Sequence, residues 1–116
     1  MTTAHETLTE VARQGRALRE AIPEVYAANA ALSKAAMDSD GELSPKIREL
    51  IALAIAISKQ CDGCVASHAR GAARRGATAQ EVAETVGVAI MMNGGPATVW
   101  GPRAYAAFQE FASTTS

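Results

Sequence analysis

The chain has 116 residues, a length typical of one domain, and 48% of them are hydrophobic, 20% charged and 4% aromatic. This composition excludes intrinsic disorder, and nine Gly and four Pro without a period exclude collagen-like repeats. The 11 basic and 12 acidic residues nearly cancel, so we expect no nucleic-acid partner.

The compartment is predicted from apolar runs and cysteine usage. The longest apolar run, Leu50–Ile57, is far shorter than the ~20 residues that span a bilayer, so we expect no membrane partner. The first six residues lack the basic and apolar regions of a signal peptide. We therefore expect a cytoplasmic protein. In a reducing compartment, a close cysteine pair is more often redox-active or metal-binding than structural.

Helical signals run through almost the whole chain, because apolar residues recur at helical spacing and no stretch alternates apolar and polar residues. We predict an all-α fold with one domain over residues 1–116. It should be a compact bundle of about six helices, with a frayed tail at 113–116. Small Ala-rich helices bury little area each, so we also expect a homo-oligomer.

The expected helices follow from their start and stop signals. Pro23 and Ser44-Pro45 mark two helix starts, Gly76 caps a helix end, and Thr78 with Glu81 forms a capping box. In chain order, the predicted helices cover about 7–21, 23–37, 45–58, 61–75, 79–92 and 97–112.

One group of residues suggests chemistry: Glu49, Cys61, Cys64 and His68. If a helix begins at Cys61, Cys64 lies in its first turn, where free N–H groups and the helix dipole favour a thiolate. His68 lies one turn beyond Cys64 on the same helix face, so the two can exchange a proton.

Glu49 is unusual because it heads the apolar stretch that reads as a buried helix, where a carboxylate needs a partner. If the helices on either side of residue 60 form a central antiparallel pair, Glu49 and His68 lie about one helical turn apart in height. They could then be neighbours, directly or through a water. The predicted relay runs from Glu49 through His68 to Cys64, with Cys61 beside it.

Each of these residues also has a plainer interpretation. The cysteines could be inert buried thiols, or could hold zinc with His68 and a fourth ligand. The zinc interpretation is weakened because the sequence has no second pair of ligands. Glu49 could simply form a salt bridge with Lys46, with Arg48 or with a residue elsewhere in the chain. The case for catalysis depends on all four residues acting together.

The segment Cys61-Asp62-Gly63-Cys64-Val65-Ala66-Ser67-His68, preceded by Glu49, resembles the signature of the carboxymuconolactone decarboxylase-like superfamily. It is most similar to the alkylhydroperoxidase D-like branch. The likeness extends through Gly71, Gly76-Ala77-Thr78, Glu81 and Glu84 to Asn93-Gly94-Gly95-Pro96, covering roughly residues 40–112.

The resemblance implies trimers or hexamers and a thiol peroxidase or disulfide reductase that needs no metal or other cofactor. It makes Cys64 peroxidatic and Cys61 resolving, with Glu49 and His68 relaying protons and a lipoyl or thioredoxin-like protein as reductant. One position departs: better-studied members have a second His between the cysteines, where this chain has Gly63. The alternatives are a lactone decarboxylase using Glu49 and His68, or a non-enzymatic, zinc-held helical module.

Overall fold

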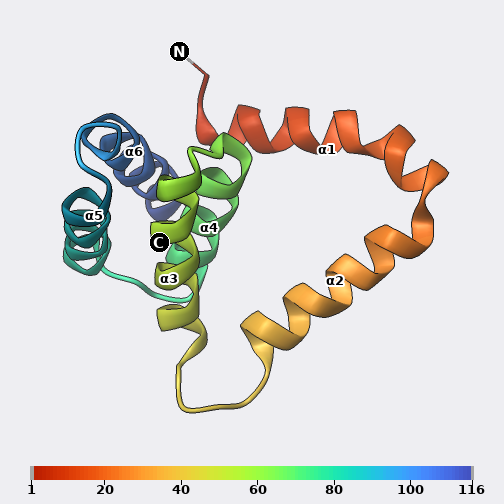
Figure 1. The fold of residues 1–116 in the computed structure, drawn as a ribbon, viewed down its shortest axis with the longest axis horizontal. Helices are drawn as coiled ribbons and strands as arrows, with labels where there is room; N and C mark the ends of the chain where they lie inside the picture. The colour runs from red at the N-terminus through yellow and green to blue at the C-terminus, as the bar shows by residue number, and fades with distance from the viewer. Residues whose placement is uncertain (1, 116) are drawn as a thin grey trace.

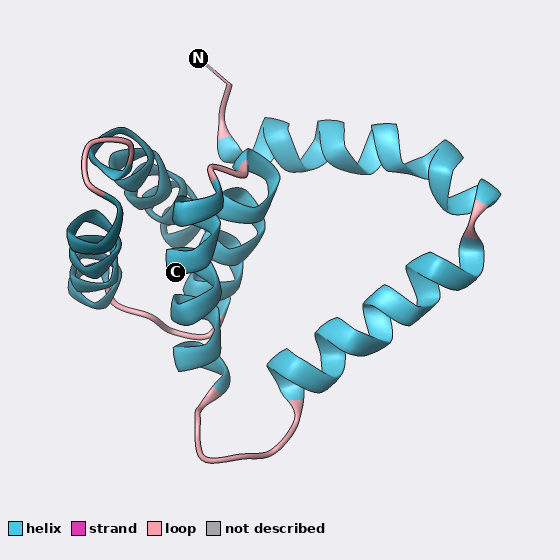
Figure 2. Ribbon diagram, viewed as in Figure 1, coloured by secondary structure: helices cyan, strands magenta, loops and turns pink. Residues whose placement is uncertain are grey.

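The computed structural model describes residues 2–115 and shows six α-helices and, over that range, no strand (Figure 2). The all-α class is confirmed. The helices are α1 (Ala4–Ala21), α2 (Pro23–Asp38), α3 (Pro45–Lys59), α4 (Asp62–Arg74), α5 (Ala79–Asn93) and α6 (Ala97–Thr115). None of these helices, as far as the structure describes them, is both long and apolar enough to cross a bilayer.

The helix starts follow local capping chemistry. Ser44 Oγ accepts the Ile47 N–H at the start of α3, and Thr78 and Glu81 cap α5 reciprocally. A second capping box, Thr3 with Glu6, starts α1 three residues before the predicted position. Helix α6 continues through Thr115 instead of ending near 112, so part of the expected tail is helical; Ser116 lies outside the described residues.

The core lies among α3, α4, α5 and α6, which bury the apolar faces that the sequence pattern predicts (Figure 1). Leu53, Ile57 and Val82 are the largest fully buried side chains. Helix α4 packs against both α3 and α6, and the start of α1 lies against it as well. The segment that carries the cysteines is therefore held from several sides.

Helices α1 and α2 form an arm, residues 4–38, that runs out from the bundle and back again (Figure 1). Neither helix buries a residue, and several of their large apolar side chains are exposed: Val11, Leu18, Ile22, Val25 and Leu32. The arm is fastened at its two ends. Glu110 accepts the N–H groups of Ala4 and His5, and Arg75 pairs with Asp38 at 2.8 Å.

Candidate active site

The turn between α3 and α4 positions the two cysteines. Gln60 ends α3 in the left-handed conformation (φ 54°, ψ 44°), and Cys61 follows as the N-cap of α4. Cys61 Sγ accepts the N–H of Cys64 at 3.1 Å. The two sulfurs are joined in a disulfide (S–S 2.08 Å), in which Cys64 is exposed and Cys61 half-buried.

Helices α3 and α4 run antiparallel and bring Glu49 to His68. Glu49 Oε2 lies 3.1 Å from His68 Nδ1, and the side chains are 13% and 30% exposed. The structure thus joins directly two residues that are 19 positions apart in the sequence. Cys64 lies one turn before His68 on α4, although no hydrogen bond among residues 2–115 joins the imidazole to either sulfur.

The two basic residues nearest Glu49 in the sequence are engaged elsewhere. Lys46 Nζ lies 2.9 Å from Glu81 Oε2, and Arg48 donates to Ser39 Oγ and to the carbonyl of Ala36. Neither Lys46 nor Arg48 therefore pairs with Glu49, and the observed partner of Glu49 is His68.

Gly71 is a site residue to which the sequence reasoning gave no role. A Cβ at this position would lie 2.1 Å from Glu49 Oε2 and 2.4 Å from Glu49 Cδ. The missing side chain therefore leaves the space that the carboxylate fills. The available signal was a glycine in the interior of a helix, three residues after His68 and so on the same face.

The structure also gives a physical reason for glycine between the cysteines. A Cβ at Gly63 would lie 3.3 Å from Val11 Cγ2, because α1 crosses the start of α4 there. That distance is tighter than nine in ten real contacts of a Cβ atom. A side chain at this position would require Val11 to give by a few tenths of an ångström, so α1 and a bulky residue between the cysteines compete for space.

The donor set does not resemble a metal centre. Within residues 2–115, no group of three or more His, Cys, Asp or Glu side chains lies close enough together to hold a metal ion. What the geometry provides instead is a carboxylate–imidazole pair beside a disulfide. Such an arrangement can move protons to and from a sulfur that changes oxidation state.

Comparison with known proteins shows the family of this chain. The sequence profile of the carboxymuconolactone decarboxylase family matches residues 23–111. The chain belongs to this family. A crystal structure of an apo carboxymuconolactone decarboxylase family protein from Legionella pneumophila is 36% identical, with a TM-score of 0.89. The match covers 94% of this chain and 96% of that one.

Two curated relatives span nearly the same length as this family member. An uncharacterized protein of Cupriavidus necator is 42% identical, over 93% of this chain and 96% of the relative. Uncharacterized protein 4 in the cox locus of Paracoccus denitrificans is 34% identical, over 95% of this chain and 92% of the relative. The similarity thus includes the arm as well as the bundle.

Proposed function

We propose that this chain is a thiol-dependent peroxidase and disulfide oxidoreductase of the alkylhydroperoxidase D-like branch of its family. The observation that supports this most is the 3.1 Å contact between Glu49 and His68, one helical turn from a solvent-exposed disulfide sulfur. Neither the Glu49–His68 pair nor the disulfide alone would be specific for this activity. Together they supply a proton relay and a redox-active sulfur pair.

The oxidative step begins at Cys64. The Glu49 carboxylate accepts the His68 Nδ1–H, which leaves Nε2 as the base that takes the Cys64 proton. The Cys64 thiolate attacks one oxygen of a hydroperoxide, and the O–O bond breaks. The alcohol leaves with the proton that His68 returns, and Cys64 becomes a sulfenic acid.

Cys61 then completes the cycle as the resolving residue. Its sulfur attacks the Cys64 sulfenic sulfur, the S–O bond breaks and water leaves, which yields a Cys61–Cys64 disulfide. Such a disulfide is the arrangement seen here. Two thiols of a lipoyl or thioredoxin-like donor protein then reduce it by thiol–disulfide exchange, and the donor becomes oxidised.

We further propose that the protein works in the cytoplasm as a homo-oligomer, a trimer or a hexamer. The exposed apolar residues of the arm support this assembly, since helices with no fully buried residue in their own chain gain little stability alone. Sedimentation analysis tests it. A protein that remains monomeric at tens of micromolar contradicts the proposal.

The function is tested with Cys64→Ser and Cys61→Ser. We expect Cys64→Ser to abolish peroxide turnover, and Cys61→Ser to form a sulfenic acid once without turning over. Peroxide loss and free-thiol titration measure both outcomes, and circular dichroism checks the fold. Wild-type turnover by Cys64→Ser contradicts the proposal. Lactone decarboxylation that survives thiol alkylation but not Glu49→Gln supports the family's decarboxylase chemistry instead.

A further inference from the structure

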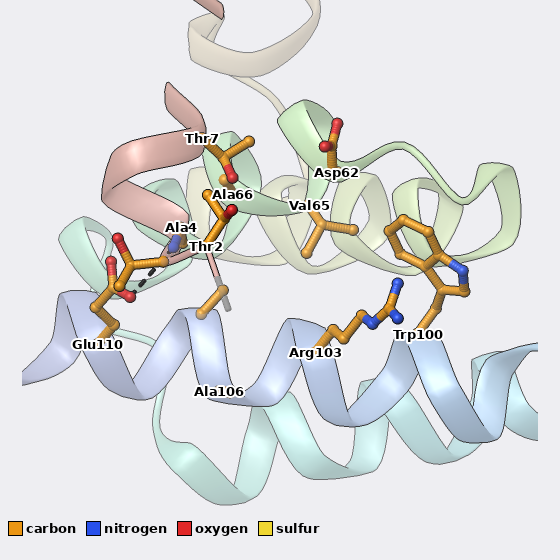
Figure 3. A pocket seen from close by; sticks show the side chains of 12 residues that line it. Thr2, Ala4, Thr7, Asp62, Val65, Ala66, Trp100, Arg103, Ala106 and Glu110 are labelled. Carbon is orange, nitrogen blue, oxygen red and sulfur yellow. Dashed lines mark hydrogen bonds between the residues drawn. The ribbon is translucent and has the colours of Figure 1, made fainter. Parts of the chain in front are cut away.

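A pocket lies between the first turn of α1, the start of α4 and the middle of α6 (Figure 3). Its volume is about 550 Å³, within the range of small-molecule sites. Small or apolar side chains form most of its wall, among them Ala4, Val65, Ala66 and Ala106. Alanines leave open space that larger side chains would fill, so this wall suits an apolar ligand body.

One cation projects into this pocket. The Arg103 side chain rises from α6 beside Trp100, and its guanidinium carbon lies 4.8 Å from the centre of the indole ring (Figure 3). This stacking holds the guanidinium plane but leaves its N–H donors unused. Among residues 2–115, Arg103 makes no ion pair or hydrogen bond. A guanidinium with free donors is suited to a carboxylate.

The two carboxylates at the edge of the pocket already have partners. Glu110 accepts the N–H groups of Ala4 and His5, at 3.2 and 2.7 Å. Asp62 Oδ1 accepts the Gly63 N–H at 2.7 Å. The Glu110 carboxylate faces the N-terminus of α1, and the Asp62 carboxylate lies at the N-terminus of α4. The positive partial charge of each helix N-terminus offsets the negative charge of its carboxylate. Of the charged side chains that line this pocket within residues 2–115, Arg103 is therefore the one without an ion-pair or hydrogen-bond partner.

We propose that the α1–α4–α6 pocket binds a small amphipathic carboxylate, a molecule with one carboxylate and a hydrocarbon body. The carboxylate pairs with Arg103, and the hydrocarbon lies along Ala66 and Ala106. The site is separate from the thiol site. Val65 and Ala66 line the pocket against α6, whereas His68 lies on the side of α4 that meets Glu49 of α3.

The probe is octanoate, and Trp100, the single tryptophan of the chain, is the reporter. We expect one octanoate per chain in titration calorimetry, with a change in tryptophan emission. Arg103→Gln and Ala106→Leu should each weaken binding by roughly tenfold or more, by removing the charged partner and by filling the pocket. Arg16→Gln on the exposed side of α1 is the matched control and should bind as the native chain does.

Octanol and octylammonium define the ligand class. Weak binding of both, beside tight binding of octanoate, supports the carboxylate assignment. Equal binding of octanol, or tighter binding of octylammonium, overturns it, as does unchanged octanoate affinity in Arg103→Gln or no binding at millimolar octanoate. Because Arg103 is exposed, we expect Arg103→Gln to fold, and this variant still tests the proposal if Ala106→Leu fails to fold. Alkylated cysteines should leave the affinity unchanged.

Discussion

Replacing Gly71 with alanine tests how the site holds its carboxylate. The new Cβ would lie 2.1 Å from Glu49 Oε2 and 2.8 Å from Oε1, and real Cβ atoms essentially never approach within 3.0 Å. Oε2 and the new Cβ must therefore move apart by at least about 0.9 Å, the difference between 2.1 and 3.0 Å, and the end of the flexible Glu49 side chain is the part that moves most easily. Because Oε2 is the atom 3.1 Å from His68, that movement disturbs the contact that orients the imidazole.

The expected effect is on rate more than on stability. A misplacement of ~1 Å in a catalytic group costs about 10²-fold in rate, so we expect peroxide turnover to fall by that order. Alanine in a helix interior gains up to about 1 kcal/mol over glycine, which offsets part of the steric cost. The free energy of unfolding should therefore change by no more than about 1 kcal/mol.

The assay is peroxide consumption with a dithiol donor across a pH series, with urea unfolding of the same samples. We expect the pH profile of Gly71→Ala to change in shape as well as in height. In a Glu49→Ala background, Gly71→Ala should cost nothing further, because the residue it displaces is gone. Gly87→Ala on α5 is the matched control, since a Cβ there meets nothing within 4 Å. Wild-type rates and pH profile in Gly71→Ala would refute the reasoning.

Three further predictions concern the scaffold. Gly63→His should loosen α1, seen as faster amide hydrogen exchange in that helix, and adding Val11→Ala should restore much of the protection. The N–H of Thr78 and the Lys46 ammonium lower the pKa of Glu81 below 4.5. The stability that the ionised Glu81 contributes should therefore be complete above about pH 4.5 and should be lost as the pH falls further. The urea midpoints of Glu81→Gln and of the native chain should then converge in acid, and a difference that stays constant with pH contradicts the prediction. Leu53→Ala should cost about 2–5 kcal/mol of unfolding free energy, since the side chain is fully buried, and a loss below 1 kcal/mol in urea unfolding contradicts the assigned core.

Local chemistry made most of the helices predictable. Caps and prolines act within a few residues, so the starts at Pro45 and Ala79 could be located from sequence. Helix α1 starts earlier than its apolar spacing predicts, because Thr3 and Glu6 form a capping box ahead of the first apolar residue of the pattern. That α1 and α2 leave the bundle could not be predicted, because their apolar spacing resembles that of a helix packed within its own chain.

The contact between Glu49 and His68 was predictable from the sequence, whereas the packing that supports it was not. Counting residues on either side of the turn placed Glu49 near His68, because helix rise is nearly constant. The space at Gly71 and the crossing of α1 over Gly63 depend on how whole helices pack. No local pattern encodes such distances. The stacking of Arg103 on Trp100 beside α4 is likewise a tertiary feature that no local pattern encodes.

The sulfur of Cys61 has both a structural and a redox role. Its sulfur receives the backbone amide at the head of α4, and it is also half of the disulfide. Serine in its place would keep an oxygen for that amide while ending sulfur exchange, whereas alanine would forfeit both at once. Comparing the serine and alanine variants thus separates the loss of the helix cap from the loss of redox activity. A single cysteine variant would not distinguish these two effects.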